Sequence, residues 1–479
     1  TNLGLSYLSL DRAGSTLSNG ELQRVQISRA VRSDTTGVLY VLDEPSIGLH
    51  PYNVDGLMKI VRELVDRKNS VVLVDHDPRI LMDADQLIEI GPGAGKEGGR
   101  IVTQGTPLEA EKNPHSLIGP YLSGKESLKV RSRATEKDMF ENGSIRIKTK
   151  PFYTVKALDV SIPKGRMIAV TGVSGSGKTS LAIECLVPAL QAVIQGTKLP
   201  EHVDSIEAKG IQSVKVIDSK PIGANVRSTV ATYDGVFDDL RKLFARTADA
   251  KAKGLTAGDF SYNTGKLRCP VCDGTGIITM DVQFLPDVDT ICPSCGGSRY
   301  GKDAYDILWK SKEKDSGSVS LPGLLKLTVE EAAGILHEET KIAKQLKILQ
   351  DLGVCYLTLG EATPALSGGE AQRLKLAYEM ETPQQGSVFV FDEPTIGLHP
   401  QDVKKLVLIF DHLIQLGATV IVIEHDLELV TNCDYIIDMG PWGGTEGGRV
   451  VVEGTPEAVA ATSESITGRY LKQELAEDK

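Results

Sequence analysis

The sequence predicts an α/β fold with two related domains, each built on a mainly parallel sheet flanked by helices. Three observations predict it. An apolar run, a glycine-rich loop and a helical pattern follow one another at residues 167–186. Short apolar runs alternate with helical patterns in both terminal thirds of the chain, which is typical of a parallel sheet covered on both faces. A long segment also recurs later in the chain.

The glycine-rich loop, Gly172–Thr179, reads G-x-x-x-x-G-K-T between the apolar run Met167–Val170 and a helical pattern that starts near Leu181. Glycines let the backbone wrap closely around a phosphate, and the loop N–H groups and the helix N-terminus face the anion. Lys178 then reaches the β- and γ-phosphates, and the Thr179 hydroxyl binds Mg²⁺. A plain Gly/Ser-rich turn is the alternative, which the complete motif disfavours. The predicted ATP-binding residues are Gly172, Ser174, Gly175, Ser176, Gly177, Lys178, Thr179 and Ser180.

Length and composition limit the class of protein. A chain of 479 residues can form two or more domains, and its net charge of -11 shows that it is not basic as a whole. No apolar run reaches the roughly 18–20 residues that cross a membrane, so we expect no membrane. Seven cysteines in a chain of this length fit a reducing, cytoplasmic location better than a disulfide framework. Because the chain begins with Thr1 rather than Met, we expect a truncated sequence.

The recurring segment keeps one offset, since Asp43 recurs as Asp392, 349 residues later, without net insertion over about 115 residues. Such fidelity predicts two copies of one fold. The paired segments are Leu17–Glu21 with Leu366–Glu370, Asp43–Pro45 with Asp392–Pro394, Val74–Asp77 with Ile423–Asp426, Gly98–Arg100 with Gly447–Arg449, and Tyr121–Leu122 with Tyr470–Leu471. In the second copy we predict helices at Glu370–Tyr378 and Val403–Leu416, and strands at Val388–Phe391 and Thr419–Ile423.

These patterns predict the domain boundaries. Residues 1–123 form part of a first domain, and the charged segment 124–149 forms a linker. Residues 150–479 form the second domain. The glycine-rich loop Gly172–Thr179, a P-loop, lies more than 200 residues before Asp392, so an insert occupies about 200–350.

The repeated motifs carry acids at the ends of predicted strands. Asp392 can hold the Mg²⁺ shell, and Glu393 can orient or deprotonate the water that attacks the γ-phosphate. His425 ends the next strand and can sense the γ-phosphate. A strand-terminal histidine is usually only packed or exposed, but its twin His76 lies at the same distance from Asp43 and Glu44. The candidate catalytic residues are Lys178, Glu393, His425, Glu44 and His76, and Asp43 is the first-copy twin of Asp392.

A second anion-binding device precedes a predicted helix in each copy. Ser367, Gly368 and Gly369 supply a hydroxyl, mobile N–H groups and a helix N-terminus, and Ser18 and Gly20 take the matching positions in the first copy. One domain does not need two such devices for one nucleotide. Two domains that face each other would share them.

Four cysteines have the spacing of a structural zinc site. Cys269 and Cys272 form one C-x-x-C pair, and Cys292 and Cys295 form another after nineteen residues. Four thiolates leave no open coordination position, so we predict structural Zn²⁺. A redox dithiol or an iron–sulfur site is the alternative. Residues 277–285 are predicted to form part of a hairpin.

A basic segment surrounds this module and has interleaved aromatic residues. Basic side chains neutralise phosphates without reading sequence. On the residues alone, an ordinary solvated face is the favoured alternative. The DNA-binding candidates are Arg227, Arg241, Lys242, Arg246 and Lys251.

The motif set matches the ATP-binding cassette, and longer segments make the chain resemble the UvrA family over nearly its whole length. UvrA is the damage-recognition ATPase of bacterial nucleotide excision repair. The segments that carry the resemblance are Leu10–Arg12, DEPSIGLHP at Asp43–Pro51, DEPTIGLHP at Asp392–Pro400, Ile90–Gly95, Ala231–Asp238 and Phe284–Val288.

The resemblance implies cassette domains with a mixed sheet, a helical signature subdomain and a zinc-binding insert. It also implies a homodimer that binds damaged or distorted double-stranded DNA, with UvrB as partner, and an ATPase of the excinuclease system that is not itself the nuclease. Lined up with the family, the chain starts late, without the first P-loop and the UvrB-binding domain. The first signature would face the P-loop at Lys178, whereas Asp43, Glu44 and His76 would face Ser367–Gly369 without a lysine.

Three departures from the family favour a divergent paralogue over the housekeeping enzyme: Asn19 in the first signature, Ser219-Lys220 in place of the Q-loop glutamine, and Phe152–Lys156 ahead of the P-loop. A resistance ATPase that clears DNA-bound drugs is therefore one alternative. The ATPase subunit of a membrane transporter is disfavoured by the zinc module and the long insert. A non-hydrolysing scaffold is a third alternative.

Overall fold

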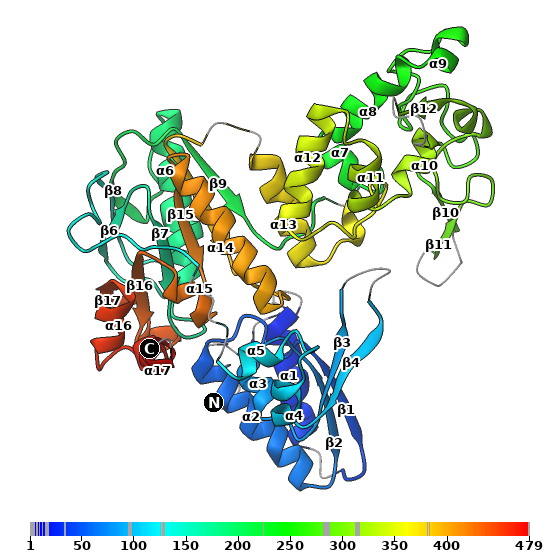
Figure 1. Cartoon of the computed structure of the whole chain (residues 1–479). Helices are drawn as coiled ribbons and strands as arrows, with labels where there is room; N and C mark the ends of the chain where they lie inside the picture. The colour runs from blue at the N-terminus through cyan, green and yellow to red at the C-terminus, as the bar shows by residue number, and fades with distance from the viewer. Residues whose placement is uncertain are drawn as a thin grey trace. The chain divides into compact units, whose positions relative to one another are not determined.

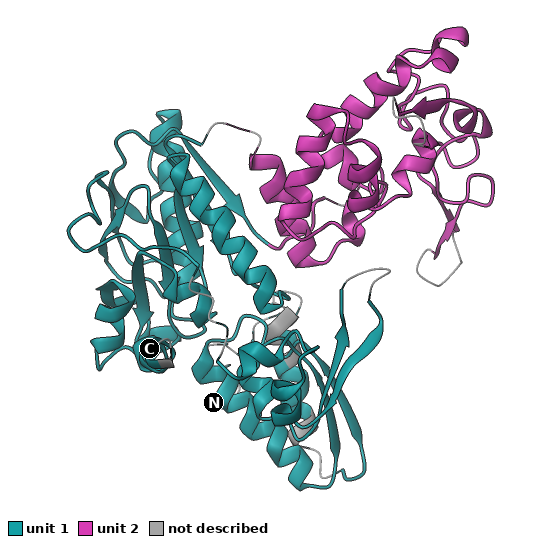
Figure 2. Cartoon of the chain, viewed as in Figure 1, with its two compact units in different colours: residues 1–218, 384–479 teal, residues 219–383 magenta. Residues whose placement is uncertain are grey.

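The computed structural model divides the chain into two compact units (Figure 2). Unit 1 contains residues 1–218 and 384–479, and unit 2 contains residues 219–383. The structure describes the chain except for residues 1–4, 6–7, 9, 12, 15–18, 33–34, 94–97, 125, 127–129, 224, 281–287, 312–316, 381, 383 and 478–479.

The second copy of the repeat in unit 1 is built on a six-stranded sheet with the order β17-β16-β7-β15-β14-β9 (Figure 1). Only the β16–β17 pair is antiparallel, so the sheet is mixed. The strands β7, β15 and β16 are buried along their whole length, which explains the apolar runs Met167–Val170 of β7 and Val420–Ile423 of β15. The buried strand β16 also contains Asp438. The strands are β7 (Met167–Thr171), β9 (Ser213–Ile217), β14 (Ser387–Asp392), β15 (Thr419–Ile423), β16 (Tyr435–Gly440) and β17 (Arg449–Gly454).

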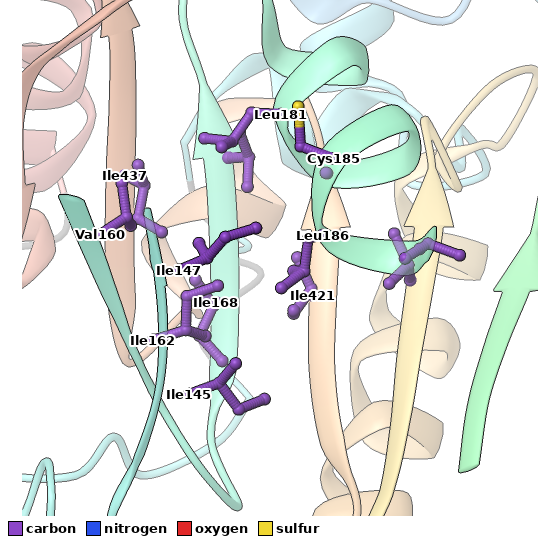
Figure 3. Packing of buried hydrophobic residues seen from close by; sticks show 14 of the residues in the cluster. Ile145, Ile147, Val160, Ile162, Ile168, Leu181, Cys185, Leu186, Ile421 and Ile437 are labelled. Carbon is purple, nitrogen blue, oxygen red and sulfur yellow. The ribbon is translucent and has the colours of Figure 1, made fainter. Parts of the chain in front are cut away.

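Helices and a second sheet enclose this core. The π-helical turn η3 (Ser180–Leu186) and α6 (Val187–Gln195) follow β7, and α14 (Pro400–Gln415) follows β14. Figure 3 shows Leu181 and Leu186 packed with Ile168 and Ile421 of the large sheet and with Ile147 of the smaller one. Three short helices complete this part: α15 (Leu427–Thr431), α16 (Pro456–Ala461) and α17 (Ile466–Glu477).

The smaller sheet has the order β6-β5-β8, with β5 (Ser144–Thr149), β6 (Asp159–Pro163) and β8 (Val203–Glu207). Strand β5 falls inside the segment 124–149, which the sequence indicated as a linker, and this boundary was wrong. Ile145 and Ile147 are fully buried, whereas the alternating polar residues gave the segment its charged composition. Upstream, the buried Arg131 pairs with Asp411 and Asp434 of the second copy.

The first copy contains the same elements at the same offset, but its strands form two separate pairs, β1-β2 and β3-β4. In the second copy β7 lies between β15 and β16, whereas no strand lies between β2 and β3 among the described residues. Leu39 and Val41 of β1 are 60% and 64% exposed, while their counterparts in β14 are buried against the core cluster that contains Leu181 and Leu186. The elements are α1 (Asn19–Arg32), β1 (Leu39–Asp43), α2 (Pro51–Asp66), β2 (Ser70–Val74), α3 (Pro78–Met82), β3 (Leu87–Gly91), β4 (Arg100–Gly105), α4 (Pro107–Lys112) and α5 (Gly119–Leu122).

Unit 2 is mainly helical and carries two β-hairpins, as the resemblance implied for the signature subdomain and its insert. Its helices are α7 (Val230–Tyr233), α8 (Val236–Ala245), α9 (Ala248–Ala252), α10 (Leu321–Leu325), α11 (Val329–Ile335), α12 (Thr340–Asp351) and α13 (Gly368–Met380). Its strand pairs are β10 (Ile277–Met280) with β11 (Val288–Ile291) and β12 (Leu308–Lys310) with β13 (Ser318–Ser320). Across the described parts of both units, every helix is too short or too polar to cross a membrane.

Candidate nucleotide-binding and metal-binding sites

The glycine-rich loop connects β7 to η3, as the sequence predicted. Its first glycine, Gly172, has φ +130°, and a Cβ there would lie 2.0 Å from the Met439 carbonyl oxygen. Any side chain would therefore clash with the neighbouring strand β16. Gly175 and Gly177 also have positive φ, of +77° and +100°. The conformation of the loop thus depends on glycine at these places.

Lys178 lies folded into this loop. Its Nζ donates to the carbonyl oxygens of Gly172 at 2.9 Å and Val173 at 3.1 Å. Burial lowers the pKa of Lys178 to about 8, although the nearby carboxylates of Glu393 and Asp392 oppose this change. The ammonium group is therefore held where a phosphate would meet both the loop N–H groups and a cation.

The loop also presents hydroxyl groups. Among the described residues, the Ser174 and Ser176 hydroxyls are buried without a hydrogen-bond partner. Thr179 is exposed, and Ser180 begins η3. Hydroxyl groups and N–H donors of this kind match the oxygens of a phosphate.

Two acids follow one another at the end of β14. Asp392 is the last residue of the strand, and Glu393 follows with φ +49° while its N–H donates to the Ile423 carbonyl at 2.9 Å. Burial, and then the charge of Asp392, raises the pKa of Glu393 to about 7, and Lys178 opposes this rise. A carboxyl group with this pKa can accept a proton near neutral pH.

His425 lies next to Glu393, with its Nε2 3.8 Å from the Glu393 Oε1. Burial and the charge of Lys178 lower the pKa of His425 well below its usual value. The imidazole is therefore neutral at neutral pH. The structure thus brings Lys178, Glu393 and His425 together.

The first copy repeats this geometry in a more solvent-exposed environment. Asp43 ends β1, Glu44 follows with φ +45°, and the His76 Nε2 lies 3.6 Å from the Glu44 Oε1. His76 is 42% exposed, and its hydrogen bond to Glu44 raises its pKa. The two histidines, at matched positions, therefore have opposite pKa shifts.

Near these acids, each copy of the repeat places a glycine close to the glutamate of the other copy. A Cβ on Gly48 of the first copy would lie 2.9 Å from the Glu393 Oε2, and a Cβ on Gly397 of the second copy would lie 3.3 Å from the Glu44 Oε1. A cavity of about 380 Å³ is lined by Glu44, His76, Glu393 and His425 together. Both copies therefore contribute side chains to one partly open cavity.

Sequence reasoning assigned no role to the residues before the two histidines. Glu424 is buried, and it accepts hydrogen bonds from the N–H groups of Thr395, His425 and Asp426. Burial raises the pKa of Glu424 to about 8. In the first copy, Asp75 likewise accepts hydrogen bonds from the N–H groups of Ser46, His76 and Asp77. The recurrence of an acid before histidine in both copies was the available signal for a carboxylate that orders this loop.

The four predicted cysteines form one cluster. The Sγ atoms of Cys269, Cys272, Cys292 and Cys295 all lie within 4.8 Å of one another, and all but Cys295 are buried. Burial opposes ionisation of Cys269, but N–H groups of Cys272 and Val271 lower its pKa to about 7. Four sulfur atoms at this spacing, with N–H groups directed at them, fit a tetrahedral zinc ion.

Comparison with known proteins shows the relationship of the chain. UvrABC system protein A of Staphylococcus aureus (strain COL) is 44% identical over 484 aligned residues, which cover 100% of this chain and 50% of that protein. The protein of the same name from Aquifex aeolicus (strain VF5) is 44% identical over 481 residues, 51% of its length. The crystal structure of UvrA2 from Deinococcus radiodurans matches 99% of this chain with a TM-score of 0.90 and 39% identity, covering 56% of that chain. The chain belongs to the UvrA family.

The chain spans about half the length of the curated UvrA relatives it matches. No protein-family model matches it. RNase-L Inhibitor matches 99% of the chain with a TM-score of 0.52 at 18% identity, which shows the shared cassette fold alone. The predicted fold class is therefore confirmed.

The two UvrA-type signatures differ in how fully the structure describes them. Helix α13 begins at Gly368, followed by Gly369, and the Ser367 N–H donates to the Glu370 Oε2 at 2.7 Å in a capping arrangement. In the first copy, Gly20 lies in the first turn of α1, while Ser18 lies outside the described residues. Of the segments that carry the UvrA resemblance, Phe284–Asp287 also lies outside them.

The basic residues near the cysteine cluster are partly neutralised by neighbours. Arg241 pairs with Asp238, Lys242 with Asp239 at 3.3 Å, and Arg227 with Asp273 at 3.6 Å. Arg246 and Lys251 are exposed, and neither forms an ion pair with a described residue. These two charges are therefore the most available to an external phosphate.

Proposed function

We propose that this chain is the part of a UvrA-family protein that binds and hydrolyses ATP in nucleotide excision repair. The observation that carries the proposal is the grouping of the buried Lys178 and His425 with the half-buried Glu393, in the segments that follow β7, β15 and β14. A P-loop cation, a carboxyl group with a pKa near 7 and a neutral imidazole are the groups that phosphoryl transfer to water requires.

Each residue has a distinct role in the proposed reaction. Lys178 exchanges its hydrogen bonds to the loop carbonyls for bonds to the β- and γ-phosphates. Glu393 accepts a proton from the attacking water, and His425 donates a hydrogen bond towards the γ-phosphate. Thr179 and Asp392 would hold Mg²⁺, which neutralises phosphate charge when bound. In the first copy Asp43, Glu44 and His76 repeat the arrangement, but no lysine at the Lys178 position accompanies them among the described residues.

Two substitutions separate binding from hydrolysis. Lys178→Ala should weaken ATP binding, because the lysine contacts phosphates in both ground and transition states. Glu393→Gln should keep ATP bound and stop turnover, because Glu393 acts on the attacking water. Affinity for a fluorescent ATP analogue and steady-state phosphate release measure the two effects. Equal loss of affinity in both variants would show that the roles are wrongly assigned.

We further propose that the protein acts on damaged or distorted duplex DNA as a cytoplasmic homodimer, with UvrB as its pathway partner. The family membership supports this proposal. The exposed cations Arg246 and Lys251 follow α8 on unit 2 and are suited to phosphates. Contacts to phosphates carry no base information, which suits recognition of many lesions.

The cysteine cluster is proposed to bind one structural Zn²⁺. Cys269, Cys272, Cys292 and Cys295 would all act as thiolate ligands and leave no position for a substrate. The ion would fix the base of the β10–β11 hairpin, because Cys292 directly follows β11 and its N–H donates to the Gly276 carbonyl at 3.0 Å. The zinc therefore has a folding role in this proposal.

A further inference from the structure

A buried chain of hydrogen bonds connects the first copy of the repeat to the P-loop strand of the second. It begins at His50, which precedes α2 and is 1% exposed. The His50 Nδ1 accepts the Tyr52 N–H at 3.2 Å, so the ring proton lies on Nε2 in the neutral imidazole. Burial lowers the pKa of His50 well below its usual value and keeps the ring neutral. The Nε2–H then donates to the Thr467 Oγ1 at 3.1 Å.

The chain continues through a buried carboxylate. The Thr467 hydroxyl donates to the Asp438 Oδ1 at 2.6 Å, and the Ser465 hydroxyl donates to the Oδ2 at 2.7 Å. The Thr171 hydroxyl also donates to the Oδ1, at 2.8 Å. Thr171 is the last residue of β7 and directly precedes Gly172. Each group in the chain therefore has a defined donor and acceptor, and the chain ends where the P-loop begins.

The matching position in the other copy lacks this chain. His399 corresponds to His50 at the 349-residue offset, but Ile118 stands where Thr467 stands, and it has no hydroxyl. Glu89 takes the place of Asp438 and is satisfied by the Ser116 hydroxyl at 2.6 Å and the Leu117 N–H at 2.7 Å. Among the described residues, His399 keeps the hydrogen bond from the Gln401 N–H, which corresponds to the helix cap of His50, and a ring contact with Tyr121. This chain of hydrogen bonds from His50 to Thr171, called the relay below, lies on the side of the repeat that has the P-loop lysine.

We propose that His50 is a positioning residue for the nucleotide site of the second copy, acting through Thr467 and Asp438 on Thr171, which directly precedes the P-loop. The proposal rests on the proposed ATP binding at Lys178. His50 holds the Thr467 hydroxyl as a donor towards Asp438, and this bond helps to keep Asp438 ionised. Asp438 in turn fixes Thr171, and its charge favours the protonated form of Lys178. The first copy thereby sets the geometry of the phosphate site across the repeat.

Paired substitutions separate the relay from the helix cap. His50→Asn keeps a side-chain acceptor for the cap but loses the donor that reaches Thr467. Thr467→Val removes the hydroxyl while preserving the side-chain shape. Loss of one buried hydrogen bond is worth about 1 kcal/mol, so each variant should weaken affinity for a fluorescent ATP analogue about fivefold. The double variant should also lose about fivefold, because both changes break the same chain.

Conservative variants and the matched histidine supply the controls. Thr467→Ser should restore wild-type affinity, and His50→Gln should restore part of it because its amide N–H reaches further than that of Asn. His399→Asn should leave affinity unchanged, since Ile118 offers no hydroxyl on that side. Thermal melting of every variant reports folding separately, and the Thr467 pair remains informative if the His50 variants unfold.

The outcomes distinguish the two levels of the proposal. If the wild-type protein does not bind the analogue, the proposed function fails and this inference fails with it. If the wild type binds but Thr467→Val does not weaken binding, only the relay is wrong. Losses in His50→Asn and Thr467→Val that multiply to about 25-fold in the double variant would also contradict it, because independent effects add in free energy.

Discussion

Replacing Gly48 by alanine should slow ATP hydrolysis without weakening ATP binding. A Cβ at Gly48 would lie 2.9 Å from the Glu393 Oε2 and 3.3 Å from its Oε1. Such a separation is too short for real carbon–oxygen contacts. The neighbouring atoms belong to the end of a flexible side chain, so the carboxylate moves rather than the backbone. The substitution therefore displaces the proposed catalytic acid by a few tenths of an ångström.

Gly397→Ala is the matched control for backbone strain. Gly48 and Gly397 have φ of +66° and +65°, so alanine at either position costs about 1 kcal/mol of stability in the left-handed region. Both variants should therefore melt about 2–4 °C below the wild type. A Cβ on Gly397 would meet Glu44 at 3.3 Å, and Glu44 belongs to the copy in which the described residues include no P-loop lysine. The strain is thus shared, while the effect on Glu393 is confined to Gly48→Ala.

The size of the kinetic effect follows from the geometry. A misplacement of about 1 Å at a reacting centre can cost about 100-fold in rate, so a shift of a few tenths should lower kcat about tenfold in Gly48→Ala. Gly397→Ala should stay within about twofold of the wild type. Steady-state phosphate release gives kcat, titration with a fluorescent ATP analogue gives affinity, and calorimetry gives the melting temperature. Equal kcat values in the two variants would refute the reasoning, as would a loss of ATP affinity in Gly48→Ala alone.

Three further predictions concern charge, metal and DNA. The pKa of Lys178 is about 8, and a phosphate binds its protonated form, so nucleotide affinity should fall about tenfold from pH 7 to pH 9. In Lys178→Arg the affinity should depend less on pH, because arginine stays protonated over this range. An unchanged wild-type affinity at pH 9 would contradict this prediction. Freshly purified, reduced protein should carry about one zinc per chain by metal analysis, and Cys272→Ser should release it. Reversing Arg246 and Lys251 should lower the slope of log affinity against log salt on duplex DNA by about two units, whereas reversing Lys253, which pairs with Asp306, should lower it less.

The sequence predicted those elements whose signal is local and periodic. The continuous apolar residues of β15 and the helix that became α14 are examples, because a strand buried on both faces or a helix with one apolar stripe shows its period directly. Strand β5 was missed because its alternating pattern has only two large apolar residues, Ile145 and Ile147, at the end of a charged segment. The cysteine cluster was predictable because ligand spacing is itself a short-range pattern.

The role of His50 could not be predicted, because its partner is distant in sequence. His50 bonds Thr467 across 417 positions, and no local pattern encodes such a pair. The role of Glu424 was missed although an acid precedes the histidine in both copies, because the burial of the carboxylate and the N–H groups that donate to it are seen only in the fold. Sequence patterns therefore predicted the groups proposed to contact the nucleotide, while the groups that orient them were found only in the fold.

The two copies keep an offset of 349 residues between matched motifs and yet provide different environments for the same chemistry. His76 faces water and gains a proton-stabilising bond from Glu44, whereas His425 is buried beside Lys178 and stays neutral. The cause lies in the sheets. Strand β7 fills the space between β15 and β16 and brings the lysine with it, while β1 and β2 keep an exposed face among the described residues. Burial and the charge of Lys178, with smaller effects of His50 and Arg24, disfavour a charged imidazole at His425, whereas the Glu44 carboxylate favours one at His76, so the two histidines have opposite pKa shifts.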